Sequence, residues 1–190
     1  MSIKGKAWKY GDDVNTDVIF PGKYTYTITD PKEMALHALE DLDSKFAKEV
    51  KKEDIIVAGR NFGCGSSREQ AATCLKYAGV GAIVAKSFAR IFFRNAINQG
   101  LPLVQCKEAA ENISSGELIE INFEKGKLSC KKGVFDFPPL PESVLGILND
   151  GGLIPHTRKI LKIEKPVCVR TCLRAYRTGR HAQAEENKDD

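Results

Sequence analysis

Three short apolar segments, joined by stretches that can each hold a helix, constrain the fold of this chain most strongly. They are Ile55–Ala58, Gly81–Ala85 and Leu101–Gln105, and each has the length of a buried strand. Parallel strands require a crossover connection that usually contains a helix, and such connections are right-handed. We therefore expect an α/β fold with a parallel βαβ core.

Two helices are predicted inside these crossovers. The first covers Ser67–Ala78 and the second Phe88–Gln99, and a glycine follows each one, at Gly79 and Gly100. Glycine is common just past the end of a helix because it adopts the left-handed conformation without strain. Both crossovers therefore have the strand, helix and stop that a βαβ unit needs.

The N-terminal part is predicted to contain a strand and a loop within Gly5–Tyr24, and then one long helix. Asp30 and Pro31 are typical of an N-cap and a first helical residue, and the apolar residues that follow lie mostly on one side of a helix. We expect this helix to end near Val50.

After the third apolar segment the pattern changes to the alternation typical of strands. Ile119 begins a run in which every second residue is apolar, and a second segment extends from Leu128 to Phe137. This pattern predicts an antiparallel hairpin with one wet face, added to the parallel core. A short helix at Glu142–Leu148 should follow.

One globular domain, residues 1–162, is predicted to precede a tail at residues 163–190. A chain of 190 residues with 42% hydrophobic content can bury one sizeable core. The tail is basic and then acidic, with few apolar residues, so we expect it to be disordered or appended. Cys168 and Cys172 leave a metal or redox site in the tail as a minor alternative.

Charge and hydropathy exclude several classes of protein. The net charge of +4 is mild and basic residues alternate with acidic ones, so no nucleic-acid partner is expected. No apolar stretch approaches the roughly 18 residues needed to span a bilayer, so we predict a soluble, cytoplasmic protein without a membrane partner. The six cysteines form no C-x-x-C pair, so we expect reduced thiols and no metal ligands.

The densest cluster of polar and glycine residues is segment 59–70, between a predicted strand and a helix. Its glycines allow close approach of a ligand, and the start of a helix offers unpaired N–H groups and a positive dipole end. Arg68 could add a bidentate donor for a carboxylate or phosphate. The segment therefore predicts a site for a small anion.

Other interpretations of this segment remain open. Ser66 and Glu69 have the spacing of a capping box, which would be purely structural. Cys64 could be a nucleophile, although no histidine is near it in sequence. The spacing does not match a G-x-S-x-G elbow, a P-loop or a dinucleotide-binding turn.

Three blocks of sequence resemble the aconitase superfamily. Segment 59–69 reads GRNFGCGSSRE and is similar to the signature of the aconitase swivel domain, and segment 86–91, KSFARI, is similar to its second block together with Asn95 and segment 99–103. Segment 12–19, DDVNTDVI, resembles the beginning of stand-alone small subunits of 3-isopropylmalate dehydratase. Gln70 stands where many relatives have histidine, a form that looks like the archaeal-type short subunits.

The resemblance implies a swivelling β/β/α domain that docks on a large subunit. That subunit would hold a [4Fe–4S] cluster, with no cofactor in this chain. The implied reaction is a hydro-lyase reaction on a small dicarboxylate, namely the isomerisation of 2-isopropylmalate and 3-isopropylmalate in leucine biosynthesis. A related dehydratase of the dimethylmalate or homoaconitase type and a non-catalytic carboxylate-binding module remain the alternatives.

The resemblance also implies roles for individual residues. Ser66 would be the catalytic base, and Gly65, Ser67 and Arg68 would bind a substrate carboxylate. Three weaker candidates would support the site: Asp17, Arg90 and Asn95.

A loop at segment 21–29 is implied to set specificity through Tyr24 and Tyr26. Homoaconitase-like relatives carry arginine where this chain has Tyr26, so the uncharged side chains of Tyr26 and Ile28 favour an alkyl-substituted malate. Alternatively, Tyr24, Tyr26 and Ile28 are strand residues that pack in the core.

Overall fold

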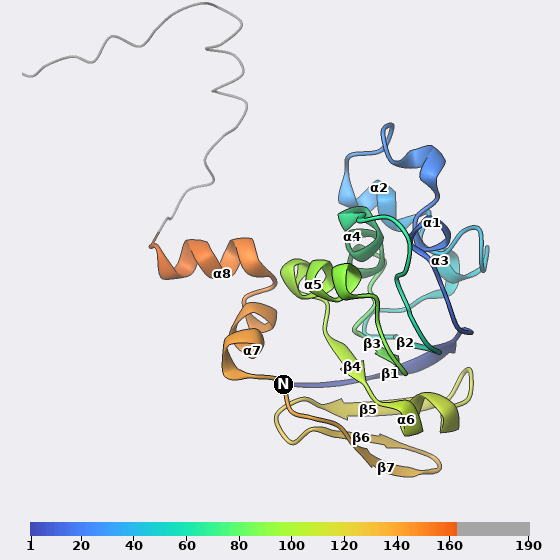
Figure 1. The fold of residues 1–190 in the computed structure, drawn as a ribbon, viewed down its shortest axis with the longest axis vertical. Coiled ribbons are helices and arrows are strands. Elements are labelled where there is room, and N and C mark those ends of the chain that lie inside the picture. The colour runs from blue at the N-terminus through green and yellow to red at the C-terminus, as the bar shows by residue number, and fades with distance from the viewer. Residues whose placement is uncertain (163–190) are drawn as a thin grey trace, which may run out of the picture. The chain divides into compact units, whose positions relative to one another are not determined.

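A seven-stranded mixed sheet, in the order β4-β3-β2-β1-β5-β6-β7, organises the part of the chain that the structure describes, residues 1–162 (Figure 1). The structure is a computed structural model. Contacts within the chain separate residues 1–157 from residues 158–190. The predicted tail at 163–190, with Cys168 and Cys172, lies outside the described residues, and the predicted boundary at 162 stays a prediction.

The parallel half of the sheet confirms the predicted βαβ core. Its strands are β1 (Ser2–Lys9), β2 (Ile55–Ala58), β3 (Ala82–Ala85) and β4 (Leu103–Gln105), and each pairs in parallel with its neighbour. All residues of β2 and β3 are buried, because both faces of these strands are covered. This explains why their sequences are continuous apolar runs.

The antiparallel half contains one strand more than predicted. β5 (Leu118–Asn122) pairs with β1, and β6 (Lys127–Cys130) pairs with β5. The predicted second arm of the hairpin then turns back on itself as β7 (Gly133–Asp136). The prediction of one continuous strand segment from Leu128 to Phe137 was wrong, because a tight turn at residues 131–132 reverses the chain.

Helices lie on both faces of the sheet (Figure 1). One core cluster joins the N-terminal helices and α4 and α5 to one face, and a second cluster joins α6 and the antiparallel strands to the other. Along β2, Ile56 belongs to the first cluster and Ile55 and Val57 to the second, as alternation of side chains along a strand requires. The helices are α1 (Thr16–Ile19), η1 (Gly22–Tyr24), α2 (Pro31–Ala35), α3 (Phe46–Glu49), α4 (Glu69–Tyr77), α5 (Arg90–Gln99), α6 (Lys107–Asn112), α7 (Glu142–Asn149) and α8 (Leu153–Ile160).

The long helix predicted from Pro31 to Val50 is wrong. Asp30 caps the start as expected, but α2 ends after Ala35, and a series of turns leads to α3. The reason is tertiary: buried Leu39 has a left-handed backbone (φ 56°), and its N–H donates to the carbonyl of Ile19 at 2.9 Å. A non-glycine residue with positive φ cannot continue an α-helix.

The crossover helices agree with the predictions except at their first residues. α4 and α5 each begin two residues later than predicted, at Glu69 and Arg90. Gly100 has a left-handed conformation (φ 77°) and ends α5 as expected. None of the helices within residues 1–162 is long and apolar enough to cross a membrane.

Candidate functional site

The glycine-rich segment lies at the carboxyl edge of the parallel strands. It follows β2 directly, while segment 12–17 follows β1 and segment 86–88 follows β3. Backbone hydrogen bonds join it to both neighbours. Ligands of open α/β sheets bind outside the carboxyl ends of the strands. The three blocks of the sequence resemblance therefore meet at the edge where a site is expected.

Backbone hydrogen bonds attach the segment to the loop after β1. The N–H of Gly63 donates to the carbonyl of Val14 at 2.7 Å, and the N–H of Thr16 donates to the carbonyl of Cys64 at 2.8 Å. Asn15 and Cys64 form a parallel bridge. These bonds hold the path of the turn without using side chains that could meet a ligand.

Asp12 fastens the beginning of the segment. Its Oδ1 accepts from the N–H of Arg60 at 2.6 Å, and this hydrogen bond is the main reason that the pKa of Asp12 lies below its usual range. A Cβ at Gly59 would lie 1.8 Å from the same oxygen, so only glycine fits there.

The loop after β3 fastens the other side. The N–H of Asn61 donates to Ser87 Oγ at 2.9 Å, and the N–H of Phe62 donates to the Ser87 carbonyl at 3.0 Å. Asn61 has positive φ (58°), and its Nδ2 donates to Asp13 Oδ1 at 2.8 Å, a local bond of the kind that lets asparagine adopt this conformation.

Gly63 brings the turn close to α5. Its φ is 79°, and a Cβ at this position would lie 2.1 Å from Cγ of the buried Phe92. The ring of Phe62 packs edge-on against Phe92 at 5.3 Å. The second crossover helix is therefore packed against the turn it supports.

The capping box at Ser66 and Glu69 is not formed. The Ser66 carbonyl accepts from the N–H of Arg68 at 2.8 Å and from Thr16 Oγ1 at 3.0 Å, so the chain turns before the helix begins. Arg68, with an extended backbone, is the N-cap of α4 and caps no N–H with its side chain, and the Glu69 carboxylate accepts instead from Gln99. Ser66 and Ser67 are exposed, so their side chains are available to a ligand.

Arg68 contacts Asp17 without using up its donors. Nη1 lies 2.5 Å from Asp17 Oδ1 and forms an ion pair with it, and no other ion pair or hydrogen bond engages the Arg68 side chain within residues 1–162. Asp17 is thus placed to orient the guanidinium, and its supporting role stays a prediction. The remaining N–H groups can bind a carboxylate in bidentate fashion.

The three residues predicted to set specificity have different environments. Ile28 is buried in the core, as the alternative interpretation stated. Tyr24 is half-buried and donates its hydroxyl to Glu40 Oε1 at 3.3 Å. Tyr26 is 94% exposed, so it is the most open to a ligand of these three residues.

Arg90 and Asn95 are not joined to the turn by a hydrogen bond or ion pair in the structure. Arg90 is exposed at the first residue of α5, and Asn95 is partly exposed one turn further along. Their proposed supporting roles therefore stay predictions.

Several residues that build the site were not singled out from the sequence. Asp12 and Asp13 brace the turn, and Thr16 binds the carbonyl of Ser66. All three belong to the polar segment after the first strand, and that segment was the sequence signal that could have identified them. Glu40, which holds the loop near Tyr26, stands in a predicted helix without a distinctive pattern.

Cysteines of the described residues are dispersed. Cys74 is fully buried, which raises the pKa of its thiol, and Cys106 is also buried, whereas Cys64 and Cys130 are partly exposed. Among residues 1–162 no three His, Cys, Asp or Glu side chains are grouped to hold a metal ion. A cluster ligand set does not fit the described residues.

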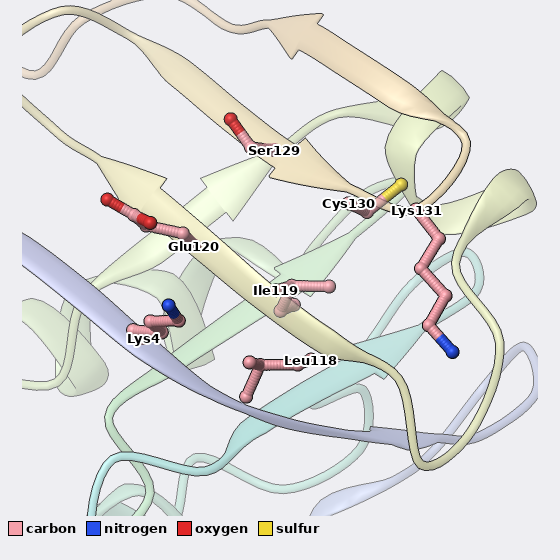
Figure 2. Close-up of a pocket in the computed structure, with 7 residues that line it drawn as sticks. All are labelled: Lys4, Leu118, Ile119, Glu120, Ser129, Cys130 and Lys131. Atoms are coloured by element: carbon pink, nitrogen blue, oxygen red, sulfur yellow. The ribbon is translucent and has the colours of Figure 1, made fainter.

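One hollow lies away from this edge of the sheet, and another lies near it. Figure 2 shows one on β1, β5 and β6, lined by Lys4, Leu118, Glu120 and Lys131 among others; it lies where β1 pairs with the antiparallel strands. A second, polar hollow is lined by Asp12, by residues of the two loops that follow β2 and β3, and by Lys107 and Glu111 of α6. Neither hollow includes Ser66, Ser67 or Arg68.

Comparisons with known proteins agree with this geometry. Residues 12–109 match the family model of the aconitase C-terminal domain, which covers the three blocks and the parallel strands β2 to β4. The fold and the turn thus place the chain in the aconitase superfamily.

Similar proteins define the family more narrowly. The chain is 52% identical over 164 residues to the 3-isopropylmalate dehydratase small subunit of Caldicellulosiruptor saccharolyticus, covering 85% of this chain and 94% of that protein. It is 51% identical over 158 residues to small subunit 1 of Archaeoglobus fulgidus, covering 82% and 97%. A crystal structure of 3-isopropylmalate dehydratase from Methanocaldococcus jannaschii matches with a TM-score of 0.78 and 41% identity, over 93% of this chain and 99% of that chain. The chain belongs to the family of 3-isopropylmalate dehydratase small subunits.

Proposed function

We propose that this chain supplies the base and the carboxylate-binding residues of a hydro-lyase that isomerises 2-isopropylmalate and 3-isopropylmalate in leucine biosynthesis. The reaction removes water to give an unsaturated diacid and adds it back at the neighbouring carbon. The observation that carries the proposal is Arg68, whose side chain pairs only with Asp17 within residues 1–162 and lies on a braced turn beside exposed Ser66 and Ser67. The similar small subunits support the choice of substrate.

Arg68 binds one substrate carboxylate in this proposal. Its guanidinium offers two parallel N–H donors, and Asp17 limits its rotation. Ser67 and the backbone at Gly65 (φ 94°) add donors beside it. The first N–H groups of α4 contribute the positive end of a helix dipole, which favours an anion.

Ser66 removes the proton next to the carboxylate. A serine hydroxyl is a weak base in water, so its alkoxide must be stabilised by fixed donors in a site that excludes solvent. The turn holds the Ser66 backbone through two hydrogen bonds, but the residue is exposed in this chain. A covering surface is therefore needed, which supports activity only after a large subunit docks here.

In this proposal the cofactor is a [4Fe–4S] cluster on the large subunit, as the resemblance to the aconitase superfamily implies. Such a cluster would act as a Lewis acid toward the departing hydroxyl group. The small subunit contributes the proton transfer and the carboxylate contacts.

The proposal is tested by assembling the chain anaerobically with a large subunit that carries the cluster. Interconversion of 2-isopropylmalate and 3-isopropylmalate by the assembly, and its absence with either subunit alone, is the expected result. Turnover by this chain alone would overturn the division of roles. Preference for dimethylmalate would change the substrate, and binding of isopropylmalate without turnover by a cluster-loaded assembly would favour a non-catalytic module.

A further inference from the structure

The Glu40 carboxylate contacts three side chains. Two belong to the loop that contains Tyr26, and the third belongs to the segment that packs against this loop. Oε1 accepts from Lys23 Nζ at 3.1 Å and from the Tyr24 hydroxyl at 3.3 Å. Oε2 lies 2.5 Å from Nδ1 of His37. These contacts, led by the one with His37, hold the pKa of the Glu40 carboxyl below its usual range.

Aromatic contacts complete this cluster. The rings of Tyr24 and His37 lie 4.0 Å apart at an angle of 33°, and Lys23 Nζ lies 4.7 Å from the centre of the Tyr24 ring. The exposed fraction of the Glu40 side chain is 33%, so the carboxylate is only partly screened by solvent. The loop therefore depends on one acidic residue for most of its side-chain attachments.

Glu40 itself stands on a fixed support. It follows Leu39, which is fully buried and bonded through its N–H to the carbonyl of Ile19. The left-handed conformation of Leu39 ends the helical path and turns the chain so that Glu40 faces the loop. A continuous helix, as the sequence predicted, would not have this turn.

The same loop touches the anion site at its other end. A Cβ at Gly22 would lie 3.1 Å from Asp17 Oδ1 and 3.3 Å from Arg68 Nη1, so the backbone at Gly22 packs against that ion pair. Pro21 and Ile28 are buried at the two ends of the loop. The loop thus lies between the carboxylate-binding arginine and Glu40.

From this geometry we infer that Glu40 is a positioning residue: it orders residues 22–28 beside Arg68 and so sets where Tyr26 meets the alkyl group of the substrate. The substrate part of this inference rests on the proposed function. The ordering part rests on the contacts of Glu40 alone. Glu40 is not expected to contact the substrate, because its carboxylate is engaged by loop donors.

The first test measures loop order in the isolated chain. Glu40→Gln should raise amide hydrogen exchange at residues 24–28 about fivefold to tenfold, because a charged acceptor for several donors is lost. Lys23→Gln, which removes the charge of one donor, should give a smaller rise. Glu49→Gln is the matched control, because Glu49 is an exposed residue of α3 whose side chain forms no hydrogen bond within residues 1–162. Unchanged exchange in Glu40→Gln would overturn the inference.

The second test uses the assembled enzyme. Glu40→Gln should raise KM for isopropylmalate about fivefold while kcat falls less than about twofold, since Ser66 and Arg68 keep their backbone supports. The preference for isopropylmalate over dimethylmalate should narrow. Faster exchange with unchanged KM and preference would show that loop order does not govern specificity and would overturn the inference.

The two tests also separate this inference from the proposed function. If the native assembly does not convert isopropylmalate, the proposed function fails, whereas the exchange measurement still decides whether Glu40 orders the loop. A fall in kcat without a change in KM would assign Glu40 to the chemical step and contradict a positioning role.

Discussion

The turn at residues 59–68 and the loop at residues 22–28 lie side by side but are held by different forces. Backbone hydrogen bonds to the loops after β1 and β3 fix the turn, and two of its glycines fit spaces that no side chain could occupy. The loop is anchored by its buried ends and by side chains that converge on Glu40. Backbone bonds are independent of most substitutions, whereas side-chain contacts are not.

In the proposed enzyme, residues of the turn carry out the chemistry and residues of the loop set the specificity. The base and the carboxylate-binding arginine lie on the part that tolerates little change, because a catalytic group must be held closely in place. Tyr26 lies on the part that single substitutions can reshape. The substrate's alkyl group could therefore be exchanged in evolution while the reaction is kept.

The largest effect is expected from Ser66→Ala in the turn. The kcat of the assembled enzyme should fall about a thousandfold or more, which corresponds to ~4 kcal/mol of lost transition-state stabilisation. The free energy of unfolding should change by less than about 0.5 kcal/mol, because Ser66 does not cap α4 in the structure. Ser129→Ala, at an exposed serine of β6, is the control for kcat. Turnover within tenfold of native would remove Ser66 as the base.

Gly63→Ala tests whether the turn is as rigid as its contacts indicate. The added Cβ would collide with Phe92, and the backbone has positive φ, so the free energy of unfolding should fall by about 3 kcal/mol. Gly11→Ala is the matched control, because a Cβ there meets nothing within 4 Å. Urea denaturation of the isolated chain measures the free energy of unfolding of both variants. Equal stability of the two variants would mean that the turn can relax.

Arg68→Lys tests the residue at which the turn contacts the loop. Lysine keeps the charge but loses the bidentate fork, so KM should rise about tenfold with a smaller change in kcat. Arg94→Lys on the exposed side of α5 is the control. Steady-state kinetics of the assembly decide the result, and an unchanged KM would mean that Arg68 does not bind the substrate carboxylate.

Tyr26→Arg should have the smallest effect on the protein and a directional effect on specificity. At 94% exposure the substitution should change the free energy of unfolding by less than about 0.5 kcal/mol. Preference should shift from isopropylmalate toward a substrate with a third carboxylate, because a cation then stands where the alkyl group is expected. Tyr26→Gln separates the charge from the loss of the ring. Equal kcat/KM ratios in native and variant would place specificity elsewhere.

The sequence by itself determined the parallel strands, their order of crossovers and the position of the glycine-rich turn. Fully buried strands must be apolar along their whole length, and the glycines needed at the turn and at the end of α5 are visible in any sequence. The residues of the three blocks, at 12–19, 59–69 and 86–103, also carried the resemblance to the family. These are local requirements, so a local pattern reports them.

Only the tertiary structure decided where the helices begin and end and which loop residue faces outward. The capping box failed because Ser66 bonds to Thr16, and the long helix failed because Leu39 bonds to Ile19. Each of these bonds joins segments far apart in the chain, and a local sequence pattern carries no information about such partners. Long-range contacts also determine that Tyr26 is exposed and that side chains of its loop bind Glu40.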